Sequence, residues 1–288
     1  MVTTTRLGND SVAERLAANF ERLTRTERKA ARCLQDHYPF LGLDTVSGFA
    51  RRAAVSAPSV LRLLDKLGFA GYGEFQSTIR REIETRLKSP LQKKQSSDQL
   101  DNNFAVEYAD QVCGNIARSM QHIPAAELER VADLLADLQR RVFFLGGRFS
   151  SALAQYGYAH LHALRGGIRQ ISGQAISWPE YLMDMQAEDL LMIFDVRRYQ
   201  FDINQFARDA QQRGVRVILF TDQWLSPVAR SATHIFSVRC QTLSKWDSFA
   251  SILVVVETLV AIITRSHWQA VEKRLEELEK VQTQLQGS

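Results

Sequence analysis

The sequence predicts two domains of different class: an all-α domain, then an α/β domain built on a parallel five-stranded sheet flanked by helices. Two patterns support this prediction. In roughly the first hundred residues, apolar side chains recur every three or four positions, as they do on one face of a helix. From residue 142 onward, short apolar runs alternate with helical segments, which is typical of βαβ units. With 288 residues, 45% of them hydrophobic and 24% charged, the chain is long enough for two cores.

Five helices are predicted in the first domain. Residues 10–38 form two of them, and we expect Pro39 to end the second, because proline has no N–H with which to continue a helix. Residues 44–68 form a pair and residues 74–87 a further helix. The polar stretch after them has few residues that could fill a core, so it is predicted to be a linker. The predicted limits are 8–88 for the first domain, 89–103 for the linker and 104–288 for the second domain.

The helical pair contains the most informative motif, a tight turn at Ala54-Val55 followed by Ser56. The Ser56 hydroxyl is suited to cap a helix, and Pro58 comes early enough that its missing N–H is not needed. Four apolar residues at helical spacing are expected to face the core, namely Val60, Leu63, Leu64 and Leu67. The opposite side is expected to carry Ser56, Ala57, Ser59, Arg62 and Lys66. This is the geometry of a helix-turn-helix, whose second helix places its N-terminal residues in the major groove of DNA.

Spacing alone fits an ordinary helical hairpin about equally well, and charge favours DNA binding. Residues 1–94 contain 17 Lys and Arg against 10 Asp and Glu, whereas residues 95–288 contain 19 against 22. A local excess of positive charge attracts the phosphate backbone of nucleic acid. A membrane surface ranks lower, because no basic amphipathic helix with exposed aromatic residues is evident. We therefore predict that the domain binds double-stranded DNA through Ser47, Arg51, Ser56, Pro58, Ser59, Arg62, Lys66 and Tyr72.

The second domain carries the apolar runs that predict its strands. They are residues 142–145, 168–171, 190–194, 215–220 and 235–238. The long apolar run Phe249–Ile263 contains Glu257 and is too short to span a bilayer, so we expect a buried helix. The last helix has apolar residues at a spacing of three and four from Trp268 to Leu285. A helix that lies on its own domain is favoured there over a coiled coil with another subunit.

Ligands of parallel α/β sheets bind beyond the carboxyl ends of the strands, and polar residues follow three of the predicted strands here. Two glycines follow the first strand, two arginines the third, and Asp222 the fourth. A tight turn without a ligand, and generic ion pairing of the arginines, remain alternatives. Lys245, Asp247 and Ser248 are expected to open the long buried helix near the same site. The predicted ligand residues are Gly146, Gly147, Arg148, Ser150, Ser151, Arg197, Arg198, Tyr199, Asp222, Lys245 and Ser248.

The cysteines and the N-terminus indicate a cytoplasmic protein. Cys33, Cys113 and Cys240 are odd in number and far apart, so neither a disulfide framework nor a zinc site is expected. The first residues lack the apolar core of a signal peptide. We predict no metal, no cofactor and no membrane partner.

Both halves together resemble the RpiR/MurR family of bacterial transcription regulators, which join a helix-turn-helix domain to a sugar isomerase (SIS) domain. The resemblance covers nearly the whole chain. It depends on the following residues: Leu23-Thr24 with Glu27, Ala54 to Arg62, Lys66 to Phe69, Gly71-Tyr72 and Phe75, Gly146-Gly147 with Ser150, Thr221, and Ser226-Pro227. It implies a homodimer or homotetramer that binds a palindromic operator, with a metabolite in the SIS domain altering the affinity for DNA.

The sequence departs from the family in one loop. SIS domains of this family usually carry Ser-x-Ser-Gly-x-Thr after the second core strand, which corresponds here to residues 190–194. In those domains the loop cradles a sugar phosphate. Here that place holds Asp195-Val196-Arg197-Arg198-Tyr199. Because Arg recognises carboxylate and phosphate groups, we expect a small anionic metabolite, either a sugar derivative or a carboxylate.

The alternative function is a sugar-phosphate isomerase with an appended helical domain. Such an enzyme needs a base next to the substrate carbonyl, and His160 and His162 are the candidates. They lie about three helical turns beyond the glycine loop, too far to serve the predicted site. We therefore predict no catalytic residues and a chain that is not an enzyme.

Overall fold

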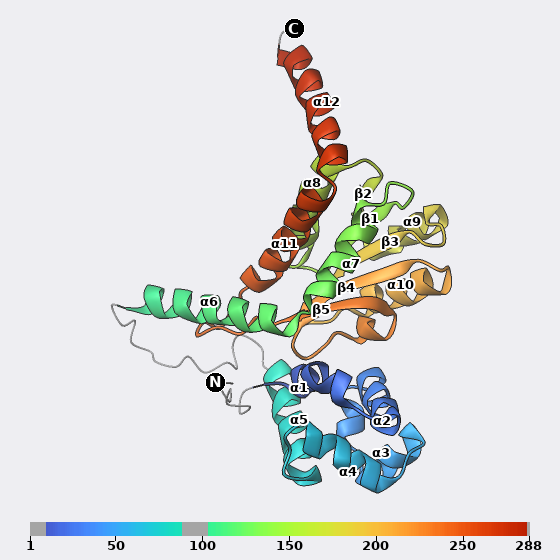
Figure 1. Cartoon of the computed structure of the whole chain (residues 1–288), viewed down its shortest axis with the longest axis vertical. Helices are drawn as coiled ribbons and strands as arrows, with labels where there is room; N and C mark the ends of the chain where they lie inside the picture. Colours follow the sequence, from blue (N-terminus) through green and yellow to red (C-terminus); the bar gives the residue numbers. More distant parts are fainter. Residues whose placement is uncertain (1–9, 88–102, 287–288) are drawn as a thin grey trace. The chain divides into compact units, whose positions relative to one another are not determined.

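The computed structural model describes residues 10–87 and 103–286 (Figure 1). They form two compact units. The helical unit consists of the described residues up to Tyr108, with segments 223–225 and 242–247, and the sheet unit consists of 109–222, 226–241 and 248–286. The predicted linker lies almost entirely outside the described residues. Among the described residues no single helix is long and apolar enough to cross a membrane, although two consecutive helices near the C-terminus reach that length together, bent by 99°.

The helical unit contains five α-helices and two short 3-10 turns, all packed around one core. Their bounds are α1 Val12–Asn19, η2 Phe20–Arg22, α2 Arg25–Asp36, η3 Phe40–Leu43, α3 Val46–Ala53, α4 Ala57–Lys66 and α5 Tyr72–Leu87. Capping boxes start α1 at Ser11 and α2 at Thr24. Each hydroxyl accepts the backbone N–H of a glutamate three residues later, and the side chain of that glutamate accepts the backbone N–H of the capping residue. The second predicted helix ends at Asp36, and Pro39 follows in the next turn.

The sheet unit confirms the predicted parallel five-stranded α/β architecture. Its elements are α6 Phe104–His122 (which begins in the helical unit), α7 Ala125–Ala136, β1 Val142–Gly146, α8 Ser151–Leu164, β2 Ile168–Gln170, η4 Ala175–Ser177, α9 Trp178–Asp184, β3 Leu190–Phe194, α10 Phe201–Gln212, β4 Arg216–Asp222, η5 Pro227–Arg230, β5 Ala232–Val238, α11 Ala250–Ser266 and α12 Trp268–Gln286. All neighbouring strands pair in parallel, in the order β2-β1-β3-β4-β5.

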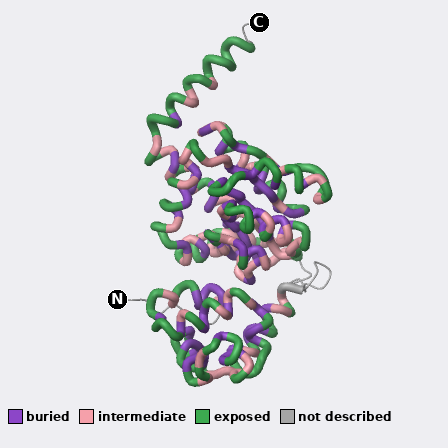
Figure 2. The backbone as a smooth tube through the Cα atoms, turned by 90° about the vertical axis from the view of Figure 1, so that its right-hand side faces the viewer, coloured by how far each residue is buried: buried purple, intermediate pink, exposed green. Residues whose placement is uncertain are grey.

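Helices pack against both faces of the sheet, so its central strands β1, β3 and β4 are buried on both sides, and Figure 2 shows buried stretches inside this unit. Successive residues of a strand point to opposite faces. Phe144 accordingly packs with α7, α8 and α11, whereas Phe143 and Leu145 pack with α9 and α10. A strand covered on both faces is apolar at every position, which is why continuous apolar runs predicted these strands.

The chain leaves β1 toward β2 on one side and later returns to β3 on the other side of β1. The carboxyl ends of β1 and β3 therefore form the switch point of the sheet, where open α/β sheets bind their ligands. The last helix only partly follows its prediction. Val271 is buried and Leu275 packs on the core, but Val281 and Leu285 are exposed where α12 extends away from the sheet (Figure 1).

Candidate functional site

The helical unit contains the predicted helix-turn-helix. Thr45 caps α3, and the helix ends at Ala54, whose φ of 49° is left-handed and reverses the chain direction. Ser56 then caps α4 by accepting the N–H of Ser59, as predicted. Lys29 on α2 donates to the carbonyl oxygen of Ala54 at 3.1 Å and so ties the turn to a third helix. The turn therefore has a fixed geometry.

The core side of α4 is confirmed, and one residue of the outer side is not. Val60, Leu63 and Leu64 are almost fully buried, while Ser56, Pro58 and Arg62 are exposed. The expected exposure of Ser59 is wrong, because this residue is only 4% exposed. Its hydroxyl lies 2.9 Å from the Ser56 hydroxyl and accepts a 3.0 Å bond from the Arg62 guanidinium. Ser59 therefore holds Arg62 in position.

Two further residues that were predicted to contact DNA, Lys66 and Tyr72, form hydrogen bonds within the helical unit. The Lys66 ammonium lies 2.7 Å from the Glu27 carboxylate, which is nearly buried. Burial alone would raise the pKa of Glu27, but hydrogen bonds from Lys66 and Thr24 outweigh it and hold the pKa below its usual value. The Tyr72 hydroxyl donates to the Asp44 carbonyl oxygen, and burial, with the charge of Asp44, raises the pKa of Tyr72 to about 12.

Ser47 and Arg51 project from the exposed side of α3. Five of the predicted residues are thus exposed without such a tie to a neighbouring helix: Ser47, Arg51, Ser56, Pro58 and Arg62.

The second candidate site lies at the switch point of the sheet. The turn after β1 is closed by Ser150, whose hydroxyl accepts the N–H of Gly147 at 2.9 Å and donates to the Phe194 carbonyl oxygen at 2.6 Å. A Cβ atom on Gly146 would lie 2.5 Å from the Ser150 carbonyl oxygen, so only glycine fits there. Ser150 is 4% exposed. Its hydroxyl acts both as donor and as acceptor, and these two bonds join the turn after β1 to the end of β3.

Gln200 was missed by the sequence analysis, and it contributes a hydrogen-bond acceptor to this loop. Its amide oxygen accepts the backbone N–H of Arg148 at 2.8 Å. A Cβ atom on Gly147 would come within 2.5 Å of the same oxygen. Free N–H groups at such a turn are the usual partners of a bound anion. No signal in the sequence distinguishes this glutamine, since the contact joins residues 52 positions apart.

The loop after β3 is held by Asp222 at the end of β4. Asp222 is fully buried, and its two oxygens accept the backbone N–H of Arg197 and the hydroxyl of Tyr199, each at 2.6 Å. Arg197 has a φ of 66°, a left-handed conformation that this bond supports. Asp222 thus positions the loop, and the adjacent Arg198 is exposed.

The remaining predicted ligand residues differ in their surroundings. Arg148 and Ser151 are exposed, and the Arg148 guanidinium lies 5.1 Å from the Phe149 ring centre. The expectation that Lys245, Asp247 and Ser248 open the long helix is wrong. The N-cap of α11 is Phe249, and the helix begins at Ala250. Ser248 instead precedes the helix and accepts the N–H of Ala250, while Lys245 and Asp247 belong to a segment that groups with the helical unit.

The two histidines of α8 have aromatic neighbours. The His160 and Tyr156 rings are tilted by 53° with centres 4.5 Å apart, and His162 stacks on Tyr158 with centres 5.2 Å apart. Both histidines are exposed. Within residues 10–87 and 103–286, no group of three or more His, Cys, Asp or Glu side chains is arranged to hold a metal ion.

Comparison with known families agrees with both architectures. Residues 11–86 match the family model of the helix-turn-helix domain of the rpiR family, and residues 135–262 match that of the SIS domain. The chain thus combines an rpiR-family helix-turn-helix domain with a SIS domain. In these terms, α3 and α4 are the helix-turn-helix of the RpiR domain, and the switch point of β1 and β3 lies in the SIS domain.

Three known proteins illustrate the relationship. "Bifunctional protein glk" of Paraburkholderia xenovorans is 27% identical over 242 residues, which cover 78% of this chain and 35% of that protein. The chain thus spans about a third of the length of this relative. The sugar isomerase domain of an RpiR transcription factor from Sphaerobacter thermophilus covers 62% of this chain and 99% of its own, with 21% identity and a TM-score of 0.58. The Vibrio vulnificus NanR protein complexed with ManNAc-6P covers 96% and 99%, with 17% identity and a TM-score of 0.55. The two solved structures share the fold.

Proposed function

We propose that this chain is a transcriptional regulator that binds DNA through α3 and α4 and whose affinity for DNA is set by a small anionic metabolite in its SIS domain. The observation that carries the proposal is the union of an rpiR-family helix-turn-helix and a SIS domain in one chain. A ligand changes the affinity for DNA only if it binds one arrangement of the protein more tightly than another.

The exposed end of α4 enters the major groove in this proposal. Arg62, held by Ser59, reads base edges, while Ser56 and Pro58 lie at the N-terminal end that approaches the DNA first. Ser47 and Arg51 on α3 contact the backbone of the duplex. Two copies bind the two halves of a palindromic operator, with half-sites one helical turn or a multiple of it apart.

Replacing Arg62 with Ala should weaken binding to a selected operator about 10- to 100-fold and relax the base preference at one position in each half-site. The reason is that a guanidinium supplies two fixed donors to a guanine edge. The operator is first selected from random duplexes with the wild-type chain, and binding is then measured by fluorescence anisotropy. Arg80→Ala, which removes an exposed arginine from α5, is the matched control. Unchanged affinity and base preference in the Arg62 variant would show that α4 does not read the bases.

We propose an effector with a phosphate or carboxylate group, bound at the switch point of the sheet. Arg148 and Arg198 are exposed on the two loops that meet there, and Gly147, Ser150 and Asp222 shape those loops. Tyr199 and Arg197 complete the β3 loop, and Ser151 begins α8. The bound ManNAc-6P of Vibrio NanR supports a phosphorylated sugar derivative.

A thermal-shift screen of sugar phosphates and small carboxylates tests this site. A ligand at 100 times its Kd should raise the free energy of unfolding by about 2.7 kcal/mol, since it binds only the folded state. Arg148→Ala/Arg198→Ala should abolish that shift while leaving DNA binding without ligand unchanged. Arg169→Ala, which removes an exposed arginine of β2 paired with Asp184, is the control. Survival of the shift in the double variant would exclude the switch point as the site.

We further propose that the chain is a regulator without catalytic activity. The two histidines of α8 contact tyrosine rings of the same helix, and Tyr156 in turn donates to Glu257 on α11. This arrangement holds the rings to the helix surface rather than to the loops of the switch point. Conversion of an aldose phosphate to a ketose phosphate by the purified chain would contradict this part of the proposal.

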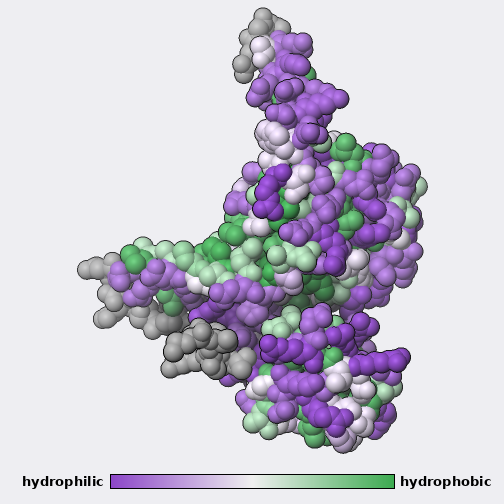
Figure 3. All heavy atoms as spheres, viewed as in Figure 1, coloured by the Kyte–Doolittle hydropathy of each residue, from purple (hydrophilic) through white to green (hydrophobic). Residues whose placement is uncertain are grey.

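We infer that the sheet unit self-associates through α11. One side of this helix packs in the core, yet Val254 and Val260 are only half-buried and Ala261 is exposed. Figure 3 shows hydrophobic residues on the visible surface at the start of α11 and along α6. Apolar residues left outside the core mark an interaction surface, and a second copy of the chain is the natural cover.

A further inference from the structure

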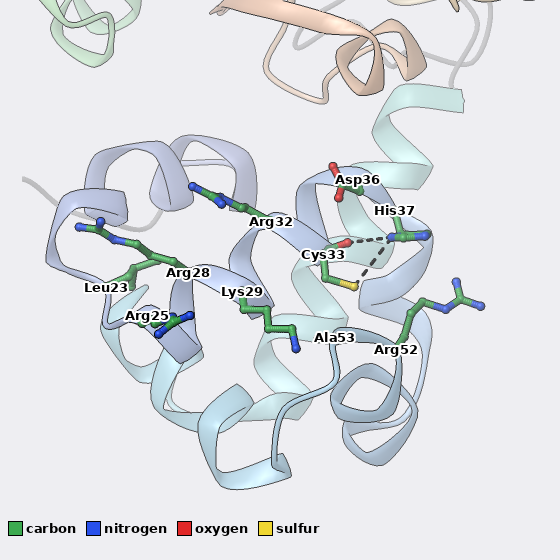
Figure 4. Close-up of a pocket in the computed structure, with 10 residues that line it drawn as sticks. All are labelled: Leu23, Arg25, Arg28, Lys29, Arg32, Cys33, Asp36, His37, Arg52 and Ala53. Carbon is green, nitrogen blue, oxygen red and sulfur yellow. Dashed lines mark hydrogen bonds between the residues drawn. The ribbon is translucent and has the colours of Figure 1, made fainter.

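The helical unit has a second positively charged surface that the sequence analysis did not include. A hollow of about 900 Å³ opens between α2 and the end of α3 (Figure 4). Five cationic side chains line it, and we call it the basic groove: Arg25, Arg28, Lys29, Arg32 and Arg52. Asp36 is the one carboxylate among the lining residues.

The cations of α2 follow one side of the helix. Arg25, Arg28, Lys29 and Arg32 are spaced by three and four residues, so like charges stand beside one another, which destabilises a helix by a few tenths of a kcal/mol per pair. Apart from the bonds that Arg28 and Lys29 form, folding stability therefore does not account for this row of charges. Arg25 to Arg32 spans about 10 Å along the helix axis, which matches three base-pair steps of a duplex.

Two of the five cations are partly used within the unit. Arg28 donates to the Glu21 carbonyl oxygen at 2.9 Å and lies 3.6 Å from its carboxylate, and Lys29 bonds the Ala54 carbonyl oxygen. Arg25, Arg32 and Arg52 form no side-chain hydrogen bond or ion pair with any residue that the structure describes. Their guanidinium groups are free to bind an anionic partner.

The basic groove begins where the helix-turn-helix reverses direction. Arg52 lies in the last turn of α3, two residues before Ala54, and Lys29 contacts Ala54 itself. Ser56, the cap of α4, follows two residues later. The middle of the row of cations thus lies against the turn that precedes α4.

We infer that the basic groove binds the phosphate backbone of the duplex beside the bases that α4 reads. This inference rests on the proposed function, and it assigns to α2 a role in affinity but none in base choice. A duplex fits better than an acidic protein segment, because the cations of α2 are regularly spaced on one side of the helix and lie beside the turn of the helix-turn-helix.

The slope of log K against log salt measures this contact. Each phosphate neutralised contributes about 0.9 to the slope, so Arg25→Ala/Arg32→Ala/Arg52→Ala should reduce it by two to three. Binding should weaken at least tenfold at 0.1 M salt, equally for the selected operator and for a mixed-sequence duplex of the same length. The control is Arg118→Ala/Arg208→Ala/Arg265→Ala, which removes three exposed arginines from the sheet unit of the same full-length chain.

The outcomes separate the two levels of the proposal. If the wild-type chain binds no duplex at all, the proposed function is wrong. If it binds and the groove variant keeps the wild-type slope, or if both triple variants lose slope equally, only the inference on the basic groove is wrong. Circular dichroism verifies that each variant keeps its helical content, and a groove variant that has lost its base preference as well as its affinity also contradicts the inference.

Discussion

Replacing Arg165 with Met should lower the free energy of unfolding of the sheet unit by about 3 kcal/mol or more. Arg165 is 4% exposed, at the end of α8. Its guanidinium donates to four backbone carbonyl oxygens, those of Leu135, Asp137, Arg140 and Gly166. The first of these belongs to the last turn of α7, whose carbonyls have no partner within the helix. Methionine fills a similar volume but leaves these oxygens unpaired in a buried place.

Urea unfolding followed by tryptophan fluorescence measures this effect, because Trp178 is buried in the sheet unit. Arg169→Met is the matched control. That side chain is 47% exposed and pairs with an Asp184 side chain that is 60% exposed, so its loss should cost less than about 1 kcal/mol. Equal unfolding midpoints for the two variants would mean that the four carbonyl oxygens find water or other donors without Arg165.

The sequence was sufficient to predict the parallel sheet, because its signal is local. Leu190–Phe194 is apolar at all five positions and forms β3 with those bounds, since helices cover both faces of the sheet. Ser56 and Pro58 likewise predicted the start of α4, because capping depends on atoms only three residues apart. The strand Ile168–Gln170 is shorter than predicted, and it pairs with one neighbour only, at the edge of the sheet.

The candidate sites were predicted less completely, because their polar side chains are used by distant parts of the chain. Ser150 and Asp222 were expected to face a ligand, yet Ser150 bonds residue 194 and Asp222 bonds the loop 25 residues before it. Gln200 is supplied to the β1 loop from another loop altogether. A sequence shows that polar residues follow the strands, but the tertiary hydrogen bonds decide which of them are left for a ligand.

The basic groove was missed for a related reason. The helical period places Arg25 and Arg32 on one side of α2, but only the packing of α2 against α3 brings Arg52 to the same hollow. The predicted DNA contacts lie on the helix-turn-helix and at Tyr72, although the excess of positive charge extends over the whole helical domain. That excess was the available signal, and a row of cations at a spacing of three and four within it would have pointed to α2.

Raising the pH from 5 to 8 should destabilise the helical unit, and Glu82→Gln should remove most of this dependence. Glu82 on α5 is 8% exposed and accepts hydrogen bonds from the Val12 N–H and the Tyr38 hydroxyl. Burial raises the pKa of Glu82 from 4.5 to about 7; the two hydrogen bonds oppose this, the Glu14 carboxylate adds to it and Arg81 reduces it.

The direction follows from the protons held by each state. Between about pH 4.5 and 7 the folded chain keeps a proton on Glu82 that the unfolded chain releases, so the folded state binds more protons and stability falls as the pH rises. The contribution of Glu82 to the stability of the folded state is complete below pH 4.5 and is lost above pH 7, and a pKa shift of this size corresponds to about 3 kcal/mol.

Amide hydrogen exchange of α1 and α5 in the full-length chain measures this loss of stability, with wild type and variant compared at each pH so that the intrinsic exchange rate cancels. Glu84→Gln, an exposed glutamate on the same helix, should leave the pH dependence intact. A Glu82→Gln variant that still loses protection between pH 5 and 8 as the wild type does would assign the titration to another group.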